Sequence, residues 1–243
     1  LQITTFYYRI FLLFSQLWNL ENNCSYLHAS AVGINGKSVV FSADSGVGKS
    51  ALLFKLSKEK NFKFIADDLT LISENTKAFF QGRCLSVKPY HLSFFPFLKE
   101  KLKILMGSAQ SLQWNIIKDD RLTFRIAPSD IFNEIREEAE IQSVIHLCNH
   151  NLDTFSIKEI SVQELLQYIT PIFTNEFFLA HHKLNILASL PNSPFISSVE
   201  MLKKTERVYA TTFYNTRVRL VLVPYKSNPH DLYYFLKMEG CLN

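Results

Sequence analysis

The sequence lacks several patterns that would each indicate a class of protein. Its four cysteines, Cys24, Cys84, Cys148 and Cys241, stand far apart and form no Cys-x-x-Cys pair. That spacing argues against a zinc site or a disulfide framework, so we expect reduced thiols and a cytoplasmic protein. No run of five or more lysines and arginines occurs, and the net charge is only +4. Nucleic acid is therefore not an expected partner, whereas a phosphate or an acidic peptide would suit the mild positive charge.

Long apolar runs and linkers are also missing. Residues 5–20 are the most apolar stretch, but Arg9 interrupts them and they fall short of the roughly 20 residues that a membrane span needs. No Ala-x-Ala cleavage site follows them. We expect a buried N-terminal helix within residues 1–23 and no membrane partner, with a membrane anchor as the alternative. No repeat or Gly/Ser linker divides residues 24–243, which are expected to form one domain.

The hydrophobic pattern predicts a mixed α/β domain with a helical C-terminal part. A hairpin is indicated by Asn35-Gly36 between two apolar runs, and Ser161 with Glu164 has the pattern of a capping box at a helix start. Strands are predicted for residues 26–34, 37–42, 61–73, 141–147, 155–157 (beside 141–147), 207–210 and 218–223, with further strands and turns over 77–97. Helices are predicted for residues 50–60, 98–106, 128–130, 161–169, 174–190, 195–204 and after Pro229.

A glycine-rich segment between a predicted strand and a predicted helix has the pattern of a phosphate-binding loop. Its glycines let successive backbone N–H groups point at phosphate oxygens, and the helix that follows adds the positive end of its dipole. The lysine would reach the β- and γ-phosphates, and the last serine would bind Mg²⁺. Alanine stands where the usual pattern begins with glycine. The loop consists of Ala43, Asp44, Ser45, Gly46, Val47, Gly48, Lys49 and Ser50.

Two adjacent carboxylates, Asp67 and Asp68, end the next predicted strand. Ligands of open α/β sheets bind at the carboxyl ends of strands, where a carboxylate can hold Mg²⁺ or accept a proton from an attacking hydroxyl. Consecutive strand residues point to opposite faces. The two side chains should therefore have different roles, unless the strand breaks at this point. The residues alone leave open which of them is the base and which binds the metal.

Three segments together resemble the catalytic domain of the HPr kinase/phosphorylase family. They are Leu-His-Ala-Ser-Ala-Val at residues 27–32, Asp-Ser-Gly-Val-Gly-Lys-Ser at 44–50 and Ile-Ala-Asp-Asp at 65–68. The resemblance implies a phosphoenolpyruvate-carboxykinase-like nucleotide fold that uses ATP and Mg²⁺. It also implies that Asp68 accepts the proton, that Ser50 binds the magnesium ion, and that His28 and Lys49 are active-site residues. Asp67 is the second candidate metal ligand, and a homo-oligomer is a possible assembly.

The first segment is more similar to a branch of shorter kinases than to the HPr enzymes. Those kinases accompany genes for ribosomally made peptides, including lasso peptides, and phosphorylate a serine of the precursor. The Gly-rich family signature with a Mg²⁺-binding Glu is not recognisable, since residues 81–97 contain no carboxylate. The expected function is thus an ATP-dependent serine kinase acting on a peptide. The alternatives are a kinase of an HPr-type protein, a kinase of a small hydroxylated metabolite such as free serine, and a non-enzymatic nucleotide sensor.

Four cations are candidates for neutralising the transferred phosphate or gripping an anionic peptide: Arg83, Lys88, Arg121 and Arg125. Each is also explained as an ordinary surface charge. The Phe-rich segment 94–97 is interpreted as buried core, with a peptide groove as the alternative.

Overall fold

The strand before the glycine loop lies in the interior of a mixed sheet. The computed structural model describes residues 6, 10–107, 114 and 122–242, and within these ranges nine strands form the main sheet. Strand β3 (Lys37–Ala43) is buried at every residue after Lys37. Val39 and Phe41 face one hydrophobic cluster and Val40 faces the other. Burial on both faces explains the unbroken apolar run of this strand.

The sheet is built around one long strand, β9 (Glu138–His150). β3 and β11 (Arg217–Pro224) pair with β9 in parallel, and β10 (Ser156–Glu159) pairs antiparallel with β11. On the other side of β3 follow β2 (Ala29–Ile34) and β4 (Lys63–Ala66). The first residues of β9 pair with a second group of strands, in the order β6 (Lys77–Phe79), β5 (Thr70–Ser73) and β1 (Cys24–Leu27).

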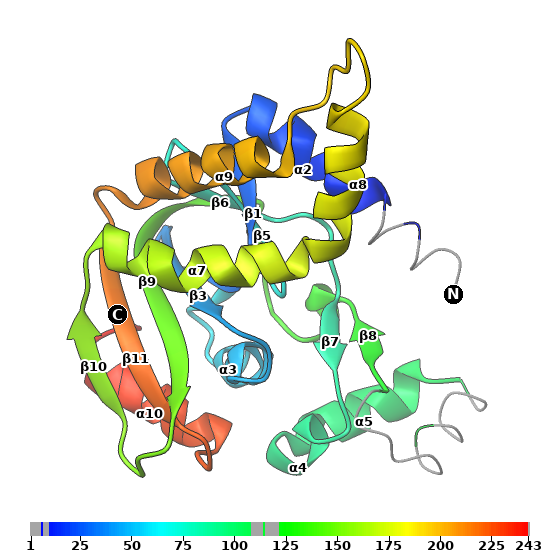
Figure 1. Ribbon diagram of the computed structural model, residues 1–243. Coiled ribbons are helices and arrows are strands. Elements are labelled where there is room, and N and C mark those ends of the chain that lie inside the picture. The colour runs from blue at the N-terminus through cyan, green and yellow to red at the C-terminus, as the bar shows by residue number, and fades with distance from the viewer. Residues whose placement is uncertain (1–5, 7–9, 108–113, 115–121, 243) are drawn as a thin grey trace.

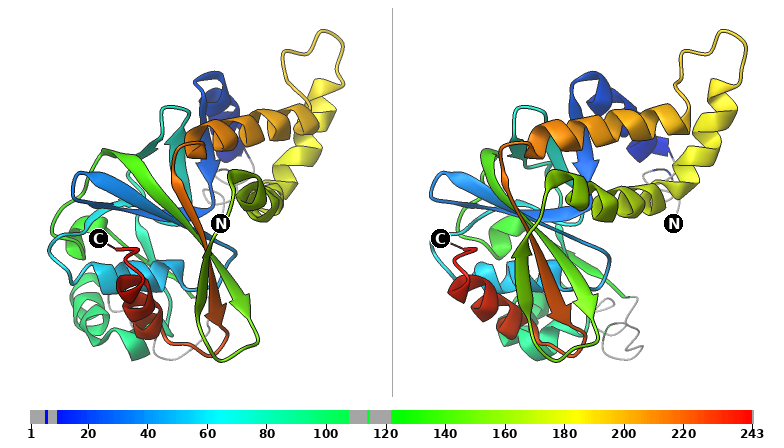
Figure 2. Two further views of the ribbon diagram at one scale, coloured as in Figure 1. Left: turned by 90° about the vertical axis from the view of Figure 1, so that its left-hand side faces the viewer. Right: turned by 60° about the vertical axis from the view of Figure 1, so that its left-hand side comes forward.

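Helices cover both faces of this sheet (Figures 1 and 2). One hydrophobic cluster lies under α2 (Leu12–Glu21), α7 (Val162–Glu176), α8 (Phe178–Ala188) and α9 (Ser198–Phe213). The other lies under α3 (Lys49–Leu56) and α10 (Pro229–Met238). The helix expected within residues 1–23 is present as α2, although Trp18 on its outer face is exposed. No helix in the described ranges is both long enough and apolar enough to span a membrane.

A small ribbon beside α3 completes the described fold. It pairs β7 (Leu85–Val87) with β8 (Phe124–Ile126) and carries α4 (His91–Phe94) and α5 (Pro96–Leu105). A 3₁₀ turn follows at Pro128–Asp130, as predicted. Phe95 is buried against α3, which confirms the interpretation of segment 94–97 as core for this residue.

Several predicted elements are wrong in extent or pairing. Residues 207–210 belong to α9, because their buried positions continue the helical spacing begun at Met201. Residues 155–157 do not lie beside β9, because β11 is inserted between them. The strand predicted over 61–73 is two strands, β4 and β5, with different partners. The helix predicted to end at Ile169 runs through Pro171 to Glu176.

Candidate functional site

The glycine loop has the backbone geometry that its sequence predicts. Gly46 and Gly48 have φ values of +85° and +113°, which glycine adopts without strain. A Cβ at Gly46 would meet nothing within 4 Å, so the backbone angle and not space requires glycine there. Gly48 precedes α3 and has no side chain to cap it. The first-turn amides of this helix therefore have no side-chain cap, and Lys49, Ser50 and Ala51 line the adjoining cavity.

Lys49 is held against the loop by its own main chain. Its Nζ donates hydrogen bonds to the carbonyl oxygens of Ala43 (2.7 Å) and Asp44 (3.0 Å). Burial lowers the pKa of Lys49 to about 8, while the nearby carboxylates of Asp67 and Asp68 oppose that shift. The side chain of Lys49 is thus a buried cation at the glycine loop.

Asp67 is buried beside the last residue of the glycine loop. Its Oδ1 accepts hydrogen bonds from Ser30 Oγ (2.7 Å) and Ser50 Oγ (3.1 Å). Its Oδ2 is buried and has no hydrogen-bond partner among the described residues. Burial raises the pKa of Asp67, and the two serine hydroxyls act in the opposite direction. A cation at this carboxylate would compensate for both its burial and its unused oxygen.

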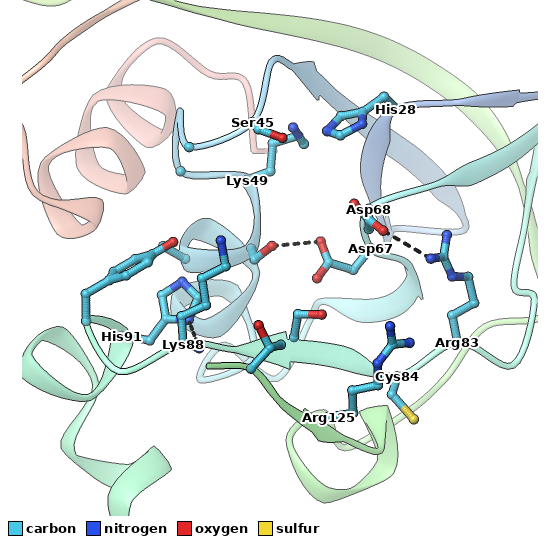
Figure 3. A pocket seen from close by; sticks show the side chains of 17 residues that line it. His28, Ser45, Lys49, Asp67, Asp68, Arg83, Cys84, Lys88, His91 and Arg125 are labelled. Atoms are coloured by element: carbon cyan, nitrogen blue, oxygen red, sulfur yellow. Dashed lines mark hydrogen bonds and ion pairs between the residues drawn. The ribbon is translucent and has the colours of Figure 1, made fainter. Parts of the chain in front are cut away.

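Asp68 lies on the same cavity as Asp67 because the strand ends before both residues. β4 stops at Ala66, and Asp68 has a φ of +72°. Because the strand breaks here, the two adjacent side chains need not point to opposite faces of the sheet. Asp68 Oδ2 accepts from Arg83 Nη2 at 3.0 Å, and the aspartate side chain is 47% exposed. Asp68 is therefore the more accessible carboxylate, and Asp67 is the one that contacts Ser50 (Figure 3).

His28 also lines the cavity. It lies between β1 and β2, not inside the single strand that the sequence predicted. Its Nδ1 is 3.0 Å from Oε1 of Glu176, the last residue of α7. The contact with His28 lowers the pKa of Glu176, and the charges of Lys49 and Arg83 act in the same direction. Glu176 was not found by sequence reasoning, because α7 was expected to end before it.

Residues 83–91 form the wall of the cavity that faces the loop. Of the four candidate cations, Arg83, Lys88 and Arg125 line the cavity, whereas Arg121 lies outside the described residues. His91, which the sequence did not single out, is buried against Phe54. Burial lowers its pKa to about 4, with Lys88 contributing. His91 is therefore a neutral side chain at neutral pH.

Together these residues surround one cavity of about 300 Å³, called here the carboxylate cavity. Figure 3 shows Lys49 and His28 on one side, Asp67 and Asp68 in the middle, and Arg83 beside them. The described residues contain no cluster of three or more His, Cys, Asp or Glu that could hold a metal ion. Mg²⁺, however, commonly binds through one or two protein oxygens plus phosphates and water. Ser50 Oγ and the unused oxygen of Asp67 fit that mode.

Comparison with known proteins adds little to this geometry. No protein-family model matches the chain, and no curated protein matches it significantly. Among solved structures, the chain is similar to the HPr(Ser) kinase/phosphatase from Coxiella burnetii, with 10% identical residues and a TM-score of 0.39. That match covers 89% of this chain and 97% of the other. A likeness this low establishes no shared fold.

Proposed function

We propose that the protein is an ATP-dependent kinase that phosphorylates a serine hydroxyl. The observation that carries this proposal is that a glycine loop and a pair of carboxylates line the same cavity. A glycine loop with a buried lysine supplies the phosphate site, and an accessible carboxylate, Asp68, lies beside the buried carboxylate Asp67 that contacts Ser50. A protein that only senses a nucleotide needs the loop, but it has no use for an accessible base at the γ-phosphate end.

The proposed reaction is a direct transfer of the γ-phosphoryl group. Asp68 accepts the proton of the acceptor hydroxyl as its oxygen forms a bond to the γ-phosphorus. The bond between that phosphorus and the β,γ-bridging oxygen breaks, and ADP leaves. Lys49 and Arg83 line the cavity and neutralise the charge on the transferred group. Catalysis of this kind depends on positioning and electrostatic stabilisation.

Magnesium would be held at the buried end of the cavity. Ser50 and Asp67 are the residues that would bind it, and it would supply positive charge at the β- and γ-phosphate oxygens. The serines donating to Asp67 keep its carboxylate oriented toward Ser50.

The acceptor is proposed to be a serine in a peptide, and a ribosomally made lasso precursor is the candidate that residues 27–32 suggest by resemblance. The cations Arg83, Lys88 and Arg125 on the cavity favour an acceptor with negative charge near the serine. An HPr-type protein and free serine are the competing acceptors.

The test is phosphate transfer by Asp68→Asn. With ATP and Mg²⁺, wild type should add one phosphoryl group to a serine of one of three acceptors: an acidic serine peptide, an HPr-type protein or free serine. Mass spectrometry of the products distinguishes them. Loss of the base should lower the transfer rate by about 10²–10⁴-fold while calorimetry shows nucleotide still bound.

Asp153→Asn is the matched control, because Asp153 is exposed in the turn between β9 and β10. It should keep full activity. Full activity of Asp68→Asn would remove the base assignment. ATP binding by wild type without transfer to any of the three acceptors would favour a nucleotide sensor.

A further inference from the structure

A second cavity lies on the other side of the glycine loop and is called here the neutral cavity. Its volume is about 470 Å³, within the range of small-molecule sites. It shares six lining residues with the carboxylate cavity, namely Ser45, Gly46, Gly48, Ala51, Lys88 and Tyr90. The two cavities therefore adjoin along the loop, with the segment around Lys88 opposite to it. A ligand with its phosphates on the loop can extend into the neutral cavity.

The neutral cavity is placed where the parallel strands end. β3, β9 and β11 run parallel, and β3 leads directly into the glycine loop. Asn149 near the end of β9 and Tyr225 just after β11 line the cavity. Leu232 of α10 closes it next to Gly48, 3.9 Å from where a Cβ of that glycine would lie. Ligands of α/β sheets bind beyond the carboxyl ends of strands, as here.

The lining of the neutral cavity differs in chemistry from that of the carboxylate cavity. None of its described lining residues is an aspartate or a glutamate, and Lys88 at the shared edge is its one charged residue. Apolar side chains, among them Val47, Phe94, Val223 and Leu232, line it together with uncharged polar ones such as Asn149 and Ser227. Such a cavity has no carboxylate to deprotonate a hydroxyl or to bind Mg²⁺. It suits an uncharged, flat part of a ligand.

Two side chains in this cavity can recognise such a group. The side-chain amide of Asn149 has no hydrogen-bond partner among the described residues, so its donor and acceptor are both available. Side-chain amides form paired hydrogen bonds with the edge of adenine. Tyr225 is 69% exposed, with its main chain fixed by a hydrogen bond to His150. An aromatic ring at the rim of a cavity can stack on a base.

We propose that the neutral cavity binds the adenosine part of the nucleotide whose triphosphate lies on residues 43–50. Asn149 reads the edge of the base, Tyr225 covers its face, and Lys88 lies at the junction near the phosphates. The acceptor then enters only from the carboxylate cavity. This assignment rests on the proposed kinase function, because it takes the triphosphate to lie on the loop.

The test compares a ligand that has a base with one that has none. Calorimetry measures binding of ATP and of inorganic tripolyphosphate, each with Mg²⁺, to wild type, Asn149→Ala and Tyr225→Ala. Each substitution should weaken ATP binding by about tenfold. Binding of tripolyphosphate should stay within twofold of wild type. Gln142→Ala is the matched control, since it removes an exposed amide from the same strand away from the cavity.

The outcomes separate this inference from the proposed function. If wild type binds both ligands and the two variants bind ATP as tightly as wild type, the neutral cavity does not hold the base. Equal weakening of both ligands would likewise overturn the assignment, because the effect would then act on the loop. If wild type binds neither ATP nor tripolyphosphate, the proposed kinase function is wrong, and the adenosine assignment is wrong with it.

Asn149→Asp adds a test of how the base is read. A carboxylate only accepts hydrogen bonds, so it cannot pair with the acceptor nitrogen of adenine but can pair with the two donors of guanine. The ratio of ATP to GTP affinity should fall by at least tenfold in Asn149→Asp. Binding of tripolyphosphate measures separately how far the added negative charge repels the phosphates. An unchanged ratio would contradict the role of Asn149.

Discussion

Lys49 is a buried cation whose protonation should set the pH range of nucleotide binding. Burial lowers its pKa to about 8, so above pH 8 the free protein loses this charge. A bound triphosphate favours the charged form, and binding at higher pH must therefore take up a proton. ATP affinity should fall by up to about tenfold per pH unit above pH 8.

Calorimetry in two buffers of different ionisation enthalpy measures that proton uptake. The matched variant is Lys49→Arg, because a guanidinium stays charged across this range and its ATP affinity should not depend on pH. An affinity for wild type that stays constant from pH 7 to 9.5 would show that Lys49 does not titrate on binding.

At the residue scale, the sequence predicts the glycine loop and the carboxylate pair better than the rest of the candidate site. The loop and the pair Asp67 and Asp68 are local patterns, because each depends on a few consecutive residues and one neighbouring element. Glu176 contacts His28, and Asn149 lines the neutral cavity, only through pairing and packing of segments that are distant from the loop in sequence. Nothing near them in sequence distinguishes them from surface polar residues.

At the element scale, the length of α7 decides whether Glu176 reaches His28. A capping box starts the helix as predicted, with Glu164 N donating to Ser161 Oγ at 3.2 Å. Proline inside a helix removes one hydrogen bond and usually ends it, yet α7 continues past Pro171. Its buried residues Leu165, Ile169 and Phe173 keep helical spacing across the proline. Packing against the sheet therefore outweighs the local signal.

The contact between α7 and His28 should act as a unit in phosphate transfer. We expect Glu176→Gln and His28→Ala each to lower the maximal transfer rate with little change in ATP affinity. The double variant should be no slower than the slower single variant, because each change removes the same contact. Steady-state kinetics on the four proteins measures the coupling. Additive losses would mean that Glu176 does not act through His28.

At the scale of the whole molecule, one buried glutamine joins the N-terminal helix and strand to a helix near the C-terminus. Gln16 of α2 donates to Ser25 Oγ (2.9 Å) and Thr205 Oγ1 (3.1 Å), and its Oε1 accepts from Tyr26 N (3.1 Å). It therefore links α2, β1 and α9. A buried polar network stabilises only while all its members are paired.

Gln16→Ala should lower the free energy of unfolding by about 2–4 kcal/mol, because it leaves buried polar groups unpaired. Denaturant unfolding measures the change, and Gln163→Ala on the exposed face of α7 is the matched control. ATP affinity of the folded variant should stay unchanged, since the network lies across the sheet from α3. A loss below 0.5 kcal/mol would mean that the network contributes little.

The sequence also predicts the mixed α/β class and the helical C-terminal part, but not the order of the strands. Strand order depends on which segments pair over long separations. β11 lies next to β9 although more than 60 residues separate them. Local propensity carries no information on such pairs.

The pairing of β3 with β9 also has a consequence for folding during synthesis. Residues 37–43 find their parallel neighbour only in residues 140–147, so a growing chain leaves the strand that carries the glycine loop with an open edge for about 100 residues of synthesis. Contacts of this range form slowly, and an unpaired apolar edge invites association with other chains. Fragments cut before residue 140 should therefore aggregate instead of forming a small nucleotide-binding domain.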